Sequence, residues 1–106
     1  MDRDGARLQI ASIARQIIRG ETDVLVGCRE IVRLRAVGGL QDDDVLLPIL
    51  GIVSETDDLP DQSARHLFSR PFLERIEKEV AGYLDQNRAD IFASCNEIIR
   101  KYSPKN

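Results

Sequence analysis

The chain has 106 residues, of which 42% are hydrophobic and 31% are charged, and its net charge at pH 7 is −3. This composition is typical of a globular domain and excludes disordered, collagen-like and membrane-embedded chains. A chain of this length buries roughly 60–70% of the surface that its unfolded form exposes, so we expect residues 1–106 to share one core and form a single domain.

The first two apolar patterns predict two short helices. Between residues 8 and 18 the apolar side chains follow helical spacing, with Asp2 and Asp4 available to cap the start and Gly20 to end the helix. A second stripe, over residues 24–35, precedes two consecutive glycines, which stop a helix in the usual C-terminal manner. Because the link between the two helices is short, we expect them to be near-antiparallel neighbours.

The third segment is ambiguous. It runs from Val45 to Val53 as an apolar stretch of nine residues that includes Pro48 and Gly51, far too short for a membrane span. Proline is excluded from central strands and tolerated in the first turn of a helix, and the aspartates before the segment are good N-caps, so we expect a short buried helix. A strand is the alternative, because the stretch is short and ends in β-branched residues.

The C-terminal third predicts one long helix. Ser69 is the expected N-cap, Pro71 lies in the first turn, and apolar residues recur in steps of three and four over residues 73–102. A helix of about 30 residues would span roughly 45 Å, so we expect a kink near Gly82 or Asn87. The predicted fold is all-α, a small helical bundle of three shorter helices packed on one long C-terminal helix.

Acidic residues are concentrated in one window of the chain. Residues 40–61 hold seven acids and no lysine or arginine, whereas the remaining 15 basic and 11 acidic residues give +4. Such a segment repels nucleic acid and attracts basic partners. We therefore predict a surface that binds a basic protein, and a solvated acidic loop balanced by the chain's own arginines is the alternative. The acids are Asp42, Asp43, Asp44, Glu55, Asp57, Asp58 and Asp61.

Other residue types offer little reactive chemistry. His66 is the only histidine and lies far in sequence from either cysteine, and the acids do not follow the spacing of a calcium loop. Cys28 and Cys95 fall on apolar stripes, so we expect them to be reduced and buried. We expect no enzymatic activity, no metal site and no cofactor. Two cysteines without a disulfide framework, and no secretory leader, predict a cytoplasmic protein.

Arg29 and Arg33 lie one turn apart on the second predicted helix, beside its apolar stripe. An arginine in such a place covers apolar surface with its aliphatic part and pairs with a carboxylate. We therefore expect both to form structural ion pairs, with Glu55 and Asp57 as partners, rather than to bind a ligand.

Two segments of the sequence look familiar. Residues 27–35 (Gly-Cys-Arg-Glu-Ile-Val-Arg-Leu-Arg) and 51–60 (Gly-Ile-Val-Ser-Glu-Thr-Asp-Asp-Leu-Pro) resemble the motifs of a group of small bacterial cytosolic helical proteins of uncharacterised function. The resemblance extends over residues 10–100 and implies a first helix, two motif-bearing segments and a long final helix. In size and acidity the chain is also similar to immunity proteins, a likeness that implies neutralisation of a toxin by binding.

The predicted function is a non-enzymatic protein-binding module, an immunity-type inhibitor that neutralises a basic toxin partner through its acidic segment. Steric occlusion and electrostatic steering would be its mechanism. Two alternatives stay open: a metal-dependent enzyme that uses Glu55, Asp57 and Asp58, and a structural subunit that forms a homodimer through the long helix. We expect neither a nucleic acid nor a membrane as partner.

Overall fold

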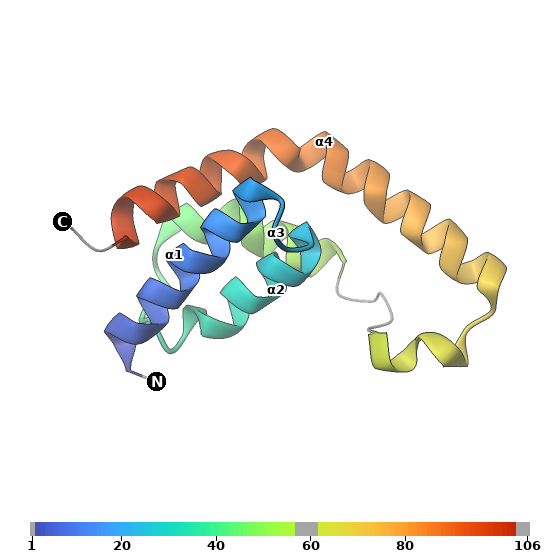
Figure 1. Ribbon diagram of the computed structural model, residues 1–106, viewed down its shortest axis with the longest axis horizontal. Helices are drawn as coiled ribbons and strands as arrows, with labels where there is room; N and C mark the ends of the chain where they lie inside the picture. The colour runs from blue at the N-terminus through green and yellow to red at the C-terminus, as the bar shows by residue number, and fades with distance from the viewer. Residues whose placement is uncertain (1, 57–61, 104–106) are drawn as a thin grey trace.

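The computed structural model describes residues 2–56 and 62–103, and within these ranges the fold is helical without strands (Figure 1). Four α-helices and two short 3₁₀ helices follow one another: α1 (Arg3–Arg19), α2 (Val24–Arg35), η1 (Asp44–Leu46), α3 (Leu47–Glu55), η2 (Gln62–Leu67) and α4 (Arg70–Tyr102). Helix α4 packs mainly against α1 and α3, and α2 packs against those two helices, which confirms the predicted all-α bundle with one long C-terminal helix. None of the described helices is both long and apolar enough to cross a membrane.

Local side-chain chemistry sets the helix ends. The Asp2 carboxylate accepts a hydrogen bond from the Gly5 amide at the start of α1, and Gly20 ends that helix with a left-handed φ of 71°. Ser69 caps α4 by accepting from the Phe72 amide. These three boundaries agree with the sequence-based expectation, because caps depend on neighbours within one turn.

The ambiguous apolar segment is helical. It forms η1 and α3, with Pro48 in the first turn of α3, where its missing N–H costs no hydrogen bond. The Asp43 carboxylate caps this segment by accepting from the Val45 amide. The helix buries Ile49 and Ile52 against the other helices, which excludes the strand alternative.

The core is built by all of α1, α2 and α3 but only by the C-terminal part of α4. The largest fully buried side chains are Ile10, Ile17, Cys28, Ile31, Leu46, Ile49, Ile91, Cys95 and Ile98. Both cysteines are free thiols with no exposed surface, as their places on the apolar stripes predict. Burial is the main cause that raises the pKa of Cys28 to about 12, and burial also raises the pKa of Cys95 to about 11. Both therefore stay protonated and act as small apolar side chains.

Helix α4 arches over the rest of the molecule and then continues beyond it (Figure 1). Its buried residues all lie between Ile91 and Ile98, whereas the first turns project away from α1, α2 and α3. The Asn87 side chain donates a hydrogen bond to the Tyr83 carbonyl one turn earlier. A side chain that competes for a backbone carbonyl bends a helix, and Asn87 is one of the two places where the sequence predicts a kink.

Gly27 marks a close approach of α1 and α2. It is buried in α2, and a Cβ atom there would lie 2.6 Å from Cγ1 and 2.7 Å from Cδ1 of Ile17 in α1. Ile17 is itself almost fully buried, so it has no free space into which to move. The glycine therefore allows α1 and α2 to pack at short range, in spite of its low helix propensity.

We predict that Gly27→Ala lowers the free energy of unfolding by about 1–3 kcal/mol, because overpacking outweighs the gain of roughly 1 kcal/mol in helix propensity. Gly82→Ala is the matched control, since the added Cβ at this exposed position of α4 meets no atom within 4 Å. That variant should gain up to about 1 kcal/mol. Urea denaturation of both proteins measures the difference, and a stabilised Gly27→Ala protein would contradict the close packing.

Candidate functional site

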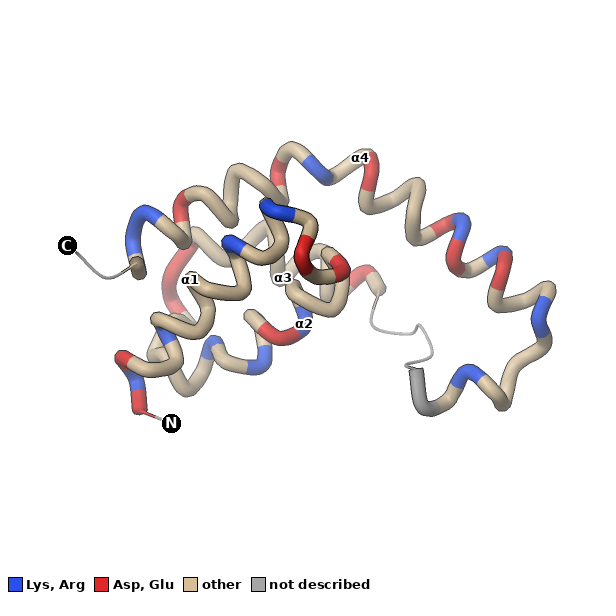
Figure 2. The backbone as a smooth tube through the Cα atoms, in the orientation of Figure 1, with Lys and Arg blue, Asp and Glu red and all other residues tan. Residues whose placement is uncertain are grey.

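The predicted acidic surface is divided between the two ends of α3. Asp42, Asp43 and Asp44 precede the helix and Glu55 is its last residue, so its nine residues separate them by about 13 Å (Figure 2). Asp57, Asp58 and Asp61 lie outside the described residues. The described acids therefore do not form one continuous patch, and the best-defined group is the loop that carries the three consecutive aspartates.

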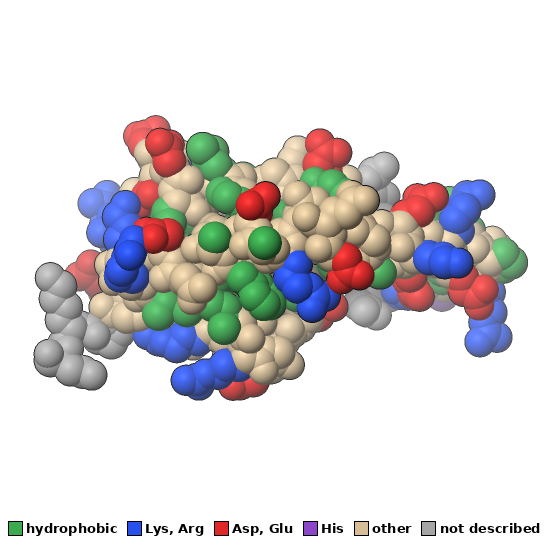
Figure 3. All heavy atoms as spheres, turned by 90° about the horizontal axis from the view of Figure 1, so that it is seen from above, with side chains coloured by type: hydrophobic (Ala, Val, Ile, Leu, Met, Phe, Trp, Pro, Cys, Tyr) green, Lys and Arg blue, Asp and Glu red, His purple; other side chains and the backbone are tan. Residues whose placement is uncertain are grey.

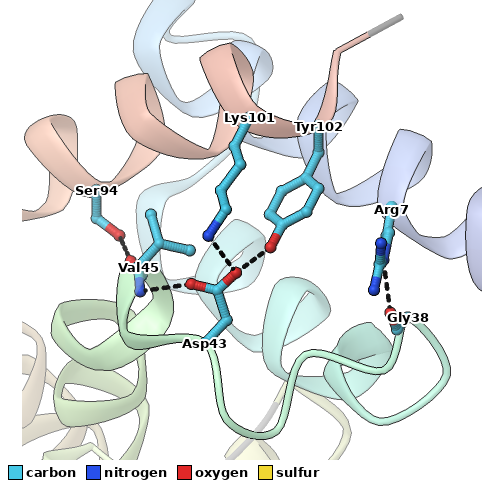
Figure 4. A network of polar contacts seen from close by, with 7 residues as sticks. All are labelled: Arg7, Gly38, Asp43, Val45, Ser94, Lys101 and Tyr102. Carbon is cyan, nitrogen blue, oxygen red and sulfur yellow. Dashed lines mark hydrogen bonds and ion pairs between the residues drawn. The ribbon is translucent and has the colours of Figure 1, made fainter.

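Asp43 is the centre of a polar network that joins this loop to the end of α4 (Figure 4). One carboxylate oxygen accepts from the Val45 amide at 3.0 Å. The other accepts from the Lys101 ammonium at 2.8 Å and from the Tyr102 hydroxyl. The side chain of Asp43 is only 15% exposed. An aspartate held by three donors of two helical elements has an internal structural role, and its role in binding a partner stays a prediction.

Further hydrogen bonds hold the same loop on its other sides. Ser94 of α4 donates to the Val45 carbonyl, and Arg7 of α1 donates from Nε to the Gly38 carbonyl at 2.8 Å (Figure 4). Arg35 of α2 donates to the Gln41 carbonyl. The loop between α2 and α3 is thus bonded to α1, α2 and α4, which fixes its backbone.

The electrostatics of Asp43 follow from these contacts. Burial alone would raise its pKa, but the hydrogen bonds from Lys101, Tyr102 and the Val45 amide outweigh burial and lower the pKa to about 2. The pKa of Tyr102 is raised, by burial and by its bond to the carboxylate, and that of Lys101 is raised by its bond to Asp43. At neutral pH the Asp43 carboxylate and the Lys101 ammonium are therefore charged, and Tyr102 keeps the proton that it donates.

The neighbours of Asp43 have a different environment. Asp42 and Asp44 are exposed, and neither forms an ion pair with another described residue. They line an open hollow of about 470 Å³ together with Arg7, Gly39, Leu40 and the three side chains of the network. One aspartate thus fixes the loop while the two beside it point their charge to solvent.

No metal site is formed by the part of the chain that the structure describes. No group of three or more histidine, cysteine, aspartate or glutamate side chains there lies close enough to hold an ion. His66 is exposed in η2, and its neighbour Arg65 pairs with Glu77 of α4. The acids of the described loop are used for structure or face solvent.

The two arginines of α2 have partners other than those expected. Arg33 forms an exposed ion pair with Glu30, one turn earlier on the same helix, rather than with Glu55. Arg29 donates a hydrogen bond of 3.1 Å to the backbone carbonyl of Thr56, which follows α3 and is itself buried. Arg29 therefore links α2 to the C-terminal end of α3, where a cation also interacts favourably with the helix dipole. The other expected partner, Asp57, lies outside the described residues.

Lys101, Tyr102 and Ser94 are site residues that sequence reasoning missed. The apolar spacing of α4 puts Tyr102 on the core-facing side, and the sequence offers Asp43 as one of the possible N-caps of the apolar segment. Nothing in the sequence joins these two observations, because the partners are 58 and 59 residues apart. Only the packing of the end of α4 beside η1 brings them together.

We predict that Asp43→Asn lowers the free energy of unfolding at pH 7 by about 1–2 kcal/mol. The carboxylate has a lower pKa when folded than its ordinary value of 3.8, so its contribution is present above about pH 4 and is lost as the pH falls toward 2. The gap between wild type and variant should close over that interval. Asp42→Asn is the control and should change stability by less than about 0.5 kcal/mol. Equal effects of the two substitutions in urea denaturation across pH would contradict the network.

We predict that Arg29→Ala destabilises the fold by about 1.5–3 kcal/mol, because a charged donor to a carbonyl at a helix end is lost. Arg33→Ala, one turn further along α2, removes only an exposed pair and should leave the urea midpoint unchanged within error. The same loss of stability in both variants would show that the contact with Thr56 has no special weight.

The motifs that carry the family resemblance lie on two packed helices. Residues 27–35 belong to α2 and residues 51–55 end α3, and Arg29 joins the two segments through Thr56. The rest of the second motif, residues 57–60, lies outside the described residues. In comparisons with known proteins, no family model, curated protein or solved structure matches this chain.

Proposed function

We propose that the protein is a non-enzymatic binding module whose acidic loop, defined here as residues 41–44, docks a basic protein. In the immunity-type form of this proposal, the partner is a basic toxin domain that is neutralised by occlusion of its surface. The observation that carries the proposal is that Asp42 and Asp44 are exposed and unpaired among the described residues, on a backbone that Asp43 holds in place.

A fixed loop favours binding because it has already lost its conformational freedom. Immobilising flexible side chains and loops on association costs roughly 0.5–1.5 kcal/mol for each side chain, and a held backbone avoids the loop's share of that cost. Asp43 ties this loop to α4, and Arg35 of α2 ties it through the Gln41 carbonyl. Arg7 of α1 holds the residues just before the loop through the Gly38 carbonyl. Two carboxylates at defined positions can then meet lysine or arginine side chains of a partner without rearrangement.

Uncompensated charge on the loop also supports electrostatic steering. Exposed carboxylates act over about 8–10 Å at physiological salt, which accelerates encounter with a basic partner more than it strengthens the final complex. Glu55 adds a third exposed acid, at the other end of α3. The described surface thus offers separate acidic points rather than one patch, which suits a partner with basic side chains spread over its contact surface.

The metal-dependent alternative has less support from the described residues. Glu55 is the only one of its three proposed ligands that the structure describes, and no cluster able to hold a metal forms around it there. The alternative of a dimerising subunit rests on the part of α4 that extends beyond the core.

We predict that Asp42→Lys/Asp44→Lys slows association with a basic partner by tenfold or more at low salt, and that the effect shrinks as ionic strength rises. The folding midpoint should hardly change, since both side chains are exposed. Basic proteins among the products of the neighbouring genes are the first candidates to test, by surface plasmon resonance at several salt concentrations.

Glu21→Lys/Asp85→Lys is the matched control, because it changes the net charge by the same amount at exposed positions outside the loop. If both double variants slow association equally, only net charge matters and the loop is not the docking surface. If association is unchanged while stability falls, the acids serve internal pairing.

A further inference from the structure

The apolar face of α4 does not end where the core ends. The steps of three and four that place Ile91 and Ile98 in the core continue toward the N-terminus of the same helix. Phe72, Leu73, Ile76 and Val80 lie on this continuing face, which we call the arm stripe, and residues 70–82 are called the arm. The four side chains are partly buried, yet none belongs to the core or packs against it among the described residues.

Only η2 and its connection lie against the arm in the described structure. Arg65 of η2 pairs with Glu77, and the rings of Phe68 and Phe72 stack with centroids 5.3 Å apart. Leu67 is nevertheless 72% exposed, and Phe68 is 41% exposed. We call Leu67 and Phe68, which lie beside the first turn of α4, the tip of the arm. The tip presents large apolar side chains to solvent, whereas the outer face of the arm carries charged residues of both signs (Figure 3).

The whole chain exposes more surface than a compact protein of its mass. The chain exposes 6935 Å² and has a radius of gyration of 14.6 Å. A compact protein of 11.9 kDa exposes roughly 5,900 Å² and has a radius of about 13 Å. The excess of about 1,000 Å² is close to the roughly 800 Å² that each partner buries in a stable interface of standard size.

The charges of the arm favour a second copy over a strongly charged partner. Residues 62–82 contain four basic and three acidic side chains, and the ion pairs Arg65–Glu77 and Arg70–Glu74 neutralise several of them. Arg75 lies over the ring of Phe72. Although the whole chain has a net charge of −3, this nearly neutral surface would not repel its own copy.

A hollow at the middle of α4 indicates how two arms could pair. It has a volume of about 190 Å³, lies between α3 and α4, and continues the stripe at Tyr83. Its lining consists of Pro48, Gly51, Ile52, Tyr83, Asn87, Asp90 and Ile91. Phe72 and Tyr83, which lines the hollow, are 11 residues apart on α4, or about 16 Å. If two arms run antiparallel with Ile76 of one copy facing Val80 of the other, Phe72 of each copy therefore reaches the hollow of the other copy.

We propose that two copies of this chain form a two-fold symmetric dimer through their arms, which pack antiparallel so that the tip of each covers the hollow of the other. The arrangement buries the part of the stripe that η2 and its connection leave exposed in the described structure. It also closes on itself, because a two-fold axis pairs the same surface of both copies. The acidic loop contacts Lys101 and Tyr102 at the opposite end of α4, so the dimer does not depend on the proposed binding function.

Sedimentation equilibrium on the full chain tests the proposal. Interfaces of this size have dissociation constants in the μM-to-pM range. At a protein concentration of about 100 μM, the wild type should therefore have twice the chain mass of 11.9 kDa. Ile76→Glu/Val80→Glu should weaken the dimer by a hundredfold or more, because it places charges in an apolar interface. Ala81→Glu, on the exposed side of the same arm, should dimerise like wild type.

A monomeric wild type at that concentration would overturn the proposal and leave the stripe to another protein or to another segment of this chain. A dimer that survives Ile76→Glu/Val80→Glu, or that Ala81→Glu disrupts equally, would show that the arm stripe is not the interface.

Circular dichroism checks that each variant is folded. If the double variant fails to fold, the tryptophan fluorescence of a Phe72→Trp variant tests the dimer instead. The chain has no other tryptophan, so the emission reports on position 72 alone. A blue shift of its emission on raising the concentration through the dissociation range supports the dimer, and constant emission rejects it.

Discussion

The fold depends on the burial of the C-terminal half of α4 across the three shorter helices. Ile91, Cys95 and Ile98 have almost no exposed surface, and they close the core that α1, α2 and α3 form on their other sides. The free energy comes from removing these apolar side chains from water, at about 25 cal/mol for each Å². Because one helix both closes this core and extends beyond it, its position determines every other surface of the molecule.

The acidic loop is one consequence of this packing. The end of α4 brings Lys101 and Tyr102 to Asp43, a contact between residues nearly 60 positions apart in the sequence. Three adjacent aspartates thereby acquire different roles, since one is desolvated and bonded while its neighbours are solvated. In a flexible segment the three carboxylates would repel one another. Here one of them stabilises the fold and the other two remain exposed on a fixed backbone, which is why this loop can serve as a docking surface.

The arm is the other consequence. A helix of 33 residues is longer than the 25–27 Å width of the molecule in its two shorter dimensions, so part of its apolar face must leave the core. Natural monomers seldom leave such a face uncovered. The two ends of α4 therefore carry surfaces of different chemistry: a fixed acidic loop at the C-terminal end and an apolar, nearly neutral stripe at the N-terminal end. A dimer through the arms would present two acidic loops at a distance from each other, and each loop could bind its own partner.

The sequence by itself determined the helices, because helix formation depends on signals within one or two turns. The caps at Asp2 and Ser69, the stop at Gly20 and the apolar periodicity of α4 act locally, and proline at position 48 was enough to favour helix over strand. The burial of the two cysteines followed from the same periodicity.

Only the tertiary structure decided which polar side chains meet. Arg33 was expected to reach Glu55 but bonds to Glu30, whereas Arg29 bonds to the carbonyl of Thr56. Partner choice between distant residues depends on how helices are rotated and offset when the core packs, and a one-dimensional pattern carries no information on that geometry.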